Sequence, residues 1–219
     1  MSWFRSFARF IVGMLVGIFF RCRVIGRQNI VSKGPIIVVA NHPSLLDPPL
    51  VGTILRREAI FIAKDGLFKS RFNSWLLKAL GAFPVNRSQL SREALKKAVE
   101  ALNSNKVLVV FPEGGRSSKG QMKEALPGAA MLASRYGVPV LPVGVVGTEK
   151  VTGFTGFIRR HRISVIIGEP FYLPTGKDKT DREQLLGLTN MVMRRIAALL
   201  PEQYHGYYAE RGQPVGTTN

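Results

Sequence analysis

Two short segments constrain the fold of this chain more than any other feature. They are apolar and β-branched at almost every position, and they read PIIVVA at residues 35–40 and KVLVVF at 106–111. A strand with one face in water alternates polar and apolar residues, whereas a strand covered on both faces is apolar throughout. Both segments are therefore predicted to be interior strands of a sheet that carries helices on its two faces.

Weaker segments of the same kind predict further strands, at residues 59–63, 81–85, 138–146 and 163–168. In the third of these, Pro139 and Pro142 lack the backbone N–H that a sheet ladder needs. This strand is therefore expected at an edge of the sheet, or to be irregular.

Amphipathic helical patterns lie between these strands, at residues 91–105, 127–137 and 181–199. Ser91 is expected to cap the first of these helices, and Thr180 with Glu183 forms a predicted capping box before the last. Strands that alternate with helices predict an α/β fold, in which a mostly parallel or mixed central sheet is flanked by helices.

The N-terminal segment FIVGMLVGIFF, residues 10–20, is uncharged and has arginines on both sides. As a helix it would be about 16 Å long at ~1.5 Å per residue, too short for a hydrocarbon core of roughly 30 Å. A signal peptide fits poorly, because its cleavage site needs small residues and RCRV follows here. Residues 1–24 are therefore predicted to form a membrane-associating helix, with an ordinary core-packing helix as the alternative.

Composition limits the partners and the compartment. The chain has 31 Lys and Arg against 14 Asp and Glu, and its net charge of +17 attracts nucleic acid, anionic lipid or phosphorylated substrates. Its single cysteine, Cys22, fits a reducing compartment, because it cannot form an internal disulfide. No His and Cys cluster has metal-ligand spacing, so no metal is predicted. Residues 25–200 are expected to form one domain, followed by a flexible tail at 201–219.

Polar residues follow four of the predicted strands, at the strand ends where open α/β sheets bind ligands. They are Asn41, His42 and Asp47 after the first strand, Lys64 after the second, Asn86 and Arg87 after the third, and Glu113, Gly114, Gly115 and Arg116 after the fourth. One edge of the sheet is therefore expected to hold a histidine–carboxylate pair beside several positive charges.

His42 and Asp47 lie in NHPSLLDPP, and Asp47 is the first acidic residue of the chain. Imidazole accepts a proton near its pKa of about 6.5, and a carboxylate on its other nitrogen selects the tautomer and stabilises the imidazolium. The chain has no nucleophile elbow, so the substrate's hydroxyl or water is the expected nucleophile. The alternative is that Asp47 only caps a helix in which Pro48 is the first residue.

The loop FPEGGRSS at residues 111–118 has the residue types of an anion site. Two glycines let the backbone approach a ligand, and Arg116 can hold a phosphate in bidentate fashion. Gln121 and Met122 stand where a P-loop requires Lys and Ser or Thr, which excludes a P-loop NTPase. A surface loop with a solvated arginine is the alternative.

Four motifs occur in one order along the chain, and together they resemble those of the glycerolipid acyltransferase family. They read NHPSLLD at 41–47, GAFPVNR at 81–87, FPEGGRS at 111–117 and VPVLPV at 138–143. Each motif alone is weak, but four in this order are specific, and the resemblance covers roughly residues 25–170.

The resemblance implies direct acyl transfer to the free sn-2 hydroxyl of 1-acylglycerol-3-phosphate, giving phosphatidic acid. Acyl-CoA or an acyl carrier protein thioester would be the co-substrate, with no cofactor. His42 oriented by Asp47 would be the general base. The acceptor would be bound by Lys64, Arg87, Glu113, Gly114, Gly115 and Arg116, with the arginines near its phosphate.

The resemblance also implies a peripheral or monotopic enzyme on an anionic membrane surface at the cytoplasmic face, without nucleic acid as a partner. Gly115 stands where the family usually has threonine, which leaves another lysophospholipid, glycerol-3-phosphate or an acylated amine lipid open as acceptor. Two other classes stay open, a hydrolase that activates water and a basic module that binds membranes or nucleic acid. The second predicts aromatic residues interleaved with Lys and Arg, and here the aromatics are scattered.

Overall fold

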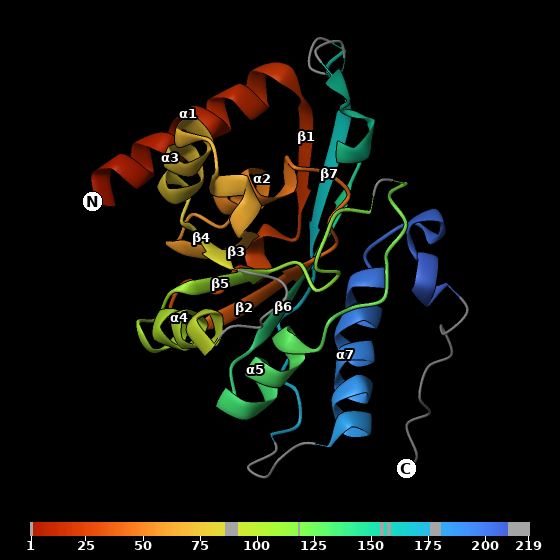
Figure 1. Cartoon of the computed structure of the whole chain (residues 1–219). Coiled ribbons are helices and arrows are strands. Elements are labelled where there is room, and N and C mark those ends of the chain that lie inside the picture. Colours follow the sequence, from red (N-terminus) through yellow and green to blue (C-terminus); the bar gives the residue numbers. More distant parts are fainter. Residues whose placement is uncertain are drawn as a thin grey trace.

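The computed structural model describes residues 2–85, 92–117, 119–153, 156, 159–175 and 181–209. Its centre is a seven-stranded sheet with the strand order β1-β7-β6-β2-β5-β3-β4 (Figure 1). The strands are β1 (Arg21–Ile25), β2 (Ile36–Ala40), β3 (Ala59–Lys64), β4 (Ala82–Val85), β5 (Val107–Val110), β6 (Val140–Val146) and β7 (Arg162–Ile167). Neighbouring strands are parallel except β6 and β7, which confirms the predicted mixed sheet.

Helices cover both faces of the sheet (Figure 1). The described α-helices are α1 (Ser2–Phe19), α2 (Asp47–Ile54), α3 (Arg71–Ala79), α4 (Arg92–Asn103), α5 (Gly128–Tyr136) and α7 (Arg182–Ala197). α1, α2 and α3 pack on one side of the sheet, and α4, α5 and α7 pack on the other. The molecule is therefore a three-layer α/β/α structure.

β2 is the strand around which the core is built. All five of its residues are buried, and they alternate between the two hydrophobic cores. Ile37 and Val39 pack with α4, α5 and α7, whereas Ile36, Val38 and Ala40 pack with α2. This burial on both faces confirms the prediction drawn from PIIVVA. Because β2 pairs in parallel with β5 and with β6, its end lies between the ends of these two strands.

Two expectations are wrong, one about the position of a strand in the sheet and one about where the N-terminal helix ends. The proline-containing strand β6 lies inside the sheet, between β2 and β7, and not at an edge. The paired residues of its antiparallel ladder with β7 begin at Val143. Pro142 lies just before them, where its carbonyl accepts the N–H of Gly168 over 2.9 Å and no donor is needed from its own nitrogen. Residues 21–24, expected in the N-terminal helix, instead belong to β1, whose Cys22 and Val24 pack against the core.

The C-terminal segment also differs from expectation. Residues 201–209 are not a free tail, because they form the short 3-10 helices η4 (Glu202–Tyr204) and η5 (Gly206–Tyr208). The rings of Tyr204 and Tyr208 are buried in the core shared with α5 and α7, and this burial holds the segment in place. The expected flexibility of residues 210–219 lies outside the described residues.

Two helices begin differently from their predicted starts. α2 begins at Asp47, one residue before Pro48. α7 is capped by Asp181, whose carboxylate accepts a hydrogen bond from the backbone N–H of Gln184. Thr180 and Ser91, the predicted caps, lie outside the described residues.

The N-terminal helix α1 packs one side on α2, where Gly13 approaches Thr53, and exposes the other side. Its exposed large apolar side chains are Phe7, Phe10, Met14, Leu15, Ile18 and Phe19, which are between 37% and 67% accessible. Within the described part of the chain, no helix is long and apolar enough to cross a membrane.

Candidate active site

The structure brings together the two residues of the predicted pair. β2 ends at Ala40, and His42 follows in a turn that leads to Asp47 at the start of α2. The His42 Nδ1–H donates to Asp47 Oδ2 over 2.9 Å. Ser44 closes the turn, because its backbone N–H donates to the same oxygen over 2.7 Å.

Asp47 has no solvent exposure, and its carboxylate is bonded on both oxygens. Oδ1 accepts a hydrogen bond of 2.7 Å from the hydroxyl of Thr148. Burial raises the pKa of Asp47 above its usual range, while the hydrogen bonds from His42, Thr148 and Ser44 oppose that rise. The three donors favour the carboxylate form of Asp47, against the effect of burial, and the carboxylate orients His42.

The alternative role of Asp47, as the cap of α2, is not what the structure has. The N-cap residue of α2 is Leu46, and no side chain caps this helix. Both oxygens of Asp47 point instead to His42, Ser44 and Thr148.

His42 Nε2 is the ring nitrogen left for a substrate. The His42 side chain is 13% exposed, and no described residue bonds Nε2. The imidazole stacks on Phe111, with ring centroids 4.3 Å apart and planes inclined by 29°. Because one face of the ring rests on Phe111 and Nδ1 is held by Asp47, the direction of Nε2 is determined.

The loop after β5 holds the backbone of His42 from both sides. The N–H of His42 donates to Glu113 Oε1 over 2.9 Å, and its carbonyl accepts the N–H of Ser117 over 2.8 Å. Glu113 Oε2 accepts the N–H of Lys123 over 3.0 Å. Burial raises the pKa of Glu113 above its usual range, and the two backbone donors oppose that rise. Glu113 thus connects the His42 turn to the segment around Lys123.

Asn41 fastens the end of β2 to the neighbouring β6. Its side-chain amide donates to the carbonyl of Val145 over 2.8 Å and accepts the N–H of Val145 over 2.7 Å. Both residues are completely buried, so this paired bond satisfies groups that water cannot reach. It sets the distance between the turn after β2 and the turn after β6.

The remaining residues of the β5 loop lie beside His42. Gly114 has φ of +64°, a conformation that favours glycine, whereas Gly115 is not among the described glycines with positive φ. Arg116 is exposed and lies between Glu113 and Ser117, the two residues that contact the His42 backbone. Its side chain is therefore accessible to solvent next to the residues that hold the His42 backbone.

Two predicted substrate ligands have no described side chain. Lys64 is the last residue of β3, so its backbone lies at the same edge of the sheet as His42. Neither its side chain nor any part of Arg87 is among the described residues. Their roles stay predictions.

Thr148 is a site residue that the sequence reasoning missed. It begins the short 3-10 helix η3 (Thr148–Lys150) after β6, at the sheet edge that carries His42. The rule that led to the other candidates, polar residues just after parallel strands, would also have selected it. The last of the four motifs, at residues 138–143, ends before Thr148.

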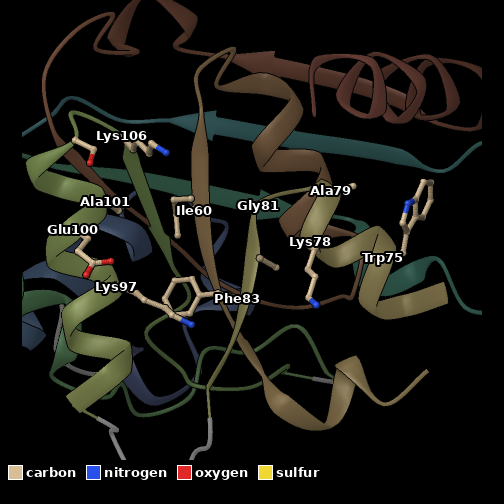
Figure 2. Close-up of a pocket in the computed structure, with 12 residues that line it drawn as sticks. Ile60, Trp75, Lys78, Ala79, Gly81, Phe83, Lys97, Glu100, Ala101 and Lys106 are labelled. Carbon is tan, nitrogen blue, oxygen red and sulfur yellow. The ribbon is translucent and has the colours of Figure 1, made fainter. Parts of the chain in front are cut away.

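A cavity of about 690 Å³ lies between α3 and α4, against β3 and β4 (Figure 2). Lys97 of α4 lies over the ring of Phe83, 5.4 Å from its centroid, and Lys78 of α3 lies on the other side. The lining includes Gly81, before β4, and Lys106, before β5, which places it toward the amino ends of these strands. Of the predicted site residues whose side chains the structure describes, none lines this cavity.

Comparison with known proteins places the chain among acyltransferases. The family model described as Acyltransferase matches residues 21–146. A chloroplastic 1-acyl-sn-glycerol-3-phosphate acyltransferase of Brassica napus is 32% identical over 181 residues, covering 77% of this chain and 51% of its own. The 1-acyl-sn-glycerol-3-phosphate acyltransferase of Bacillus subtilis is 25% identical, with 81% and 87% covered. The chain thus spans about half the length of the plant relative.

A solved structure is similar over most of the chain. The crystal structure of the 1-acyl-sn-glycerophosphate (LPA) acyltransferase of Thermotoga maritima superimposes with a TM-score of 0.63 at 30% identity. The match covers 90% of this chain and 79% of that one. The similarity therefore extends over more of the chain than the family-model match.

The hydroxyl of Thr148 gives a first prediction. Thr148→Val removes a donor to a buried carboxylate, and an unmet buried group costs about 1–3 kcal/mol. We expect kcat for acyl transfer to fall about tenfold, with KM nearly unchanged, in steady-state kinetics. The matched control is Thr189→Val, which removes a buried hydroxyl bonded to the Leu185 carbonyl within α7. Equal kcat values for the two variants would contradict this prediction.

Proposed function

The chain belongs to the acyltransferase family, and on that basis we propose that it acylates the sn-2 hydroxyl of 1-acylglycerol-3-phosphate, with an acyl thioester as donor. The product is phosphatidic acid. The observation that carries the proposal is the His42–Asp47 pair, with Nδ1 bonded to a fully buried carboxylate and Nε2 open to a substrate.

The proposed reaction is a direct transfer with His42 as general base. The acceptor hydroxyl donates to Nε2, its oxygen attacks the thioester carbonyl carbon, and its proton moves to Nε2. The tetrahedral intermediate then collapses, the carbon–sulfur bond breaks, and the leaving thiolate takes the proton from Nε2. Asp47 stabilises the imidazolium that exists between these two steps.

The surroundings of His42 support transfer without an acyl-enzyme. Among the described residues, no serine, threonine or cysteine bonds Nε2, and Ser44 instead uses its backbone N–H to bind Asp47. Cys22 lies on β1, at the edge of the sheet, three strands away from β2 in the strand order. The acceptor's own hydroxyl is therefore the nucleophile.

Recognition of the acceptor is assigned to the loop after β5. We assign Arg116 to the acceptor phosphate, because its side chain is exposed directly beside the residues that hold His42. A guanidinium matches the geometry of two phosphate oxygens. We keep Lys64 and Arg87 as proposed ligands of the acceptor. Glu113 differs, because both oxygens of its carboxylate already accept backbone N–H groups. Glu113 thus supports the reaction by positioning His42.

Membrane attachment is assigned to α1 at the cytoplasmic face. Its outward side carries large apolar residues, and the chain's net charge of +17 attracts anionic headgroups. An amphipathic helix of this kind lies in the interface and keeps a peripheral enzyme next to its lipid substrate.

The test measures thiol release from palmitoyl-CoA and from a palmitoylated carrier protein, with and without lysophosphatidic acid. We expect acceptor-dependent release, phosphatidic acid by mass spectrometry, and a loss on the order of 10³-fold in His42→Ala. Release that does not need acceptor would indicate a hydrolase. No transfer from either donor would refute the proposed acceptor, and lysophosphatidylethanolamine or glycerol-3-phosphate would then be compared as acceptors.

The separate roles of Glu113 and Arg116 predict effects on different kinetic constants, kcat for Glu113 and the acceptor KM for Arg116. In Glu113→Gln an amide NH2 group replaces one carboxylate oxygen and faces a backbone N–H, so two donors meet and His42 is displaced. We therefore expect kcat to fall about tenfold, with little change in the acceptor KM. In Arg116→Ala the acceptor KM rises about tenfold and kcat changes little. Initial rates over a range of lysophosphatidic acid concentrations measure both. A KM effect in Glu113→Gln without a kcat effect would instead make it an acceptor ligand.

Membrane binding through α1 predicts an effect of one exposed residue. Ile18 is 53% exposed, and Ile18→Glu puts a charge where the helix meets the bilayer. We expect co-sedimentation with phosphatidylglycerol-containing vesicles to fall about tenfold, since burying a large aliphatic side chain contributes about 1.5–3 kcal/mol. The control is Leu186→Glu on α7, where the residue is 43% exposed on the other side of the sheet. Equal vesicle binding by both variants would exclude α1 as the anchor.

A further inference from the structure

The segment Pro201–Ala209, here called the C-terminal strap, contacts two loops of the proposed active site. It contains η4 and η5, and its Tyr204 and Tyr208 rings are each only 3% exposed. The strap lies beyond residues 21–146, which the acyltransferase family model matches. Its contacts connect it to His42 and Asp47 by two routes.

The first route leads to Asp47 through the turn after β6. The Tyr204 hydroxyl donates to Glu149 Oε1 over 2.7 Å, and Glu149 Oε2 accepts the N–H of Gly147 over 3.0 Å. Gly147 has φ of +92°, and the residue that follows it is Thr148, the donor to Asp47 Oδ1. Glu149 therefore holds this turn between the strap and the catalytic carboxylate.

The second route leads to His42 through the segment after the β5 loop. Met122 donates its N–H to the Tyr204 carbonyl over 2.8 Å and accepts the N–H of Tyr207 over 2.9 Å. The next residue, Lys123, donates its N–H to Glu113 Oε2, and the other oxygen of Glu113 holds the N–H of His42. The strap thus supports the carboxylate that positions the His42 backbone.

Close packing brings the strap against this segment. A Cβ on Gly206 would lie 2.4 Å from the carbonyl oxygen of Met122, and Gly206 has φ of +49°. The ring of Tyr204 lies against Gly120, where a Cβ would be 3.2 Å from the ring. The Tyr208 hydroxyl accepts the N–H of Ala125 over 3.1 Å. Each contact is made with the segment at residues 120–125, which follows the β5 loop in the chain.

We propose that the C-terminal strap positions the His42–Asp47 pair, and that Tyr204 is a positioning residue for catalysis. This proposal rests on the proposed function, in which that pair is the base. Tyr204 reaches Asp47 only through Glu149 and Thr148, so it acts by holding other groups in place.

The chemistry of Tyr204 suits a permanent support. Burial and the neighbouring Glu149 carboxylate raise the pKa of Tyr204 far above its usual range, so its hydroxyl remains a donor throughout any assay pH. A misplacement of about 1 Å at a catalytic group can lower a rate by up to about 10²-fold. A small shift of the turn carrying Thr148 is therefore enough to affect turnover.

The test compares Tyr204→Phe with Tyr207→Phe in the full chain. Tyr207 takes part in the second route only through its backbone N–H, which Tyr207→Phe keeps. Its side chain is 43% exposed, and the hydroxyl that the variant removes bonds Glu124, which belongs to neither route. We expect Tyr204→Phe to lower kcat about tenfold with acceptor KM nearly unchanged, and Tyr207→Phe to retain the wild-type kcat. A purely structural role would instead lower the melting temperature of Tyr204→Phe and leave kcat, measured well below that temperature, unchanged. That outcome would overturn the proposal.

The route through Thr148 is tested by combining variants. If Tyr204 acts on Asp47 through Thr148, then Tyr204→Phe lowers kcat much less in a Thr148→Val background than in the wild type. Fully additive effects would refute this route. Gly206→Ala, which forces the strap away from Met122, is expected to lower kcat without removing any hydroxyl.

A readout that needs no lipid separates this proposal from the proposed function. Carbethoxylation by diethyl pyrocarbonate, followed by mass spectrometry, reports the nucleophilicity of each histidine. Because the Asp47 carboxylate that accepts Nδ1–H adds electron density to the ring, it makes Nε2 more nucleophilic. We therefore expect Tyr204→Phe to slow the reaction at His42 and not at His161. If the wild-type enzyme transferred no acyl group, the proposed function would fail while this measurement still tested the strap. An unchanged rate at His42 would refute the positioning role.

Discussion

The buried carboxylate of Asp47 is the group on which the arrangement of the site depends. A carboxylate without solvent contact is unfavourable as an anion unless donors surround it. His42 and Ser44 come from the turn after β2, while Thr148 comes from the turn after β6. These two turns meet only because β2 and β6 are neighbours in the sheet.

The parallel arrangement of β5, β2 and β6 brings their three following loops to one edge. Asn41 links the ends of β2 and β6, and Glu113 and Ser117 link the β5 loop to His42. The interior of the sheet is apolar and buried, so the polar groups gather where the strands end. His42 is thus held through its side chain by one loop and through its backbone by another.

α1 and the C-terminal strap pack on opposite faces of the sheet. α1 packs on the side of α2 and exposes its apolar residues, whereas the C-terminal strap packs with α5 and α7 (Figure 1). On the proposals made above, α1 brings the enzyme to its lipid, and the strap stiffens the two loops that hold the base. On these proposals, the sheet separates attachment to the membrane from support of His42 and Asp47.

Local patterns in the sequence were sufficient to predict the layers, most strands and the grouping of His42, Asp47 and the β5 loop. Hydrophobic periodicity and the residues that follow each strand can be identified from neighbouring positions in the chain. The edge placement of β6 failed, since Pro142 is tolerated just before its ladder with β7 begins. The contact of Thr148 with Asp47, the link from Asn41 to Val145 and the burial of Tyr204 were decided by tertiary structure alone. Their partners lie from 55 to 104 residues away, and only the strand order and the packing against α7 bring them into contact.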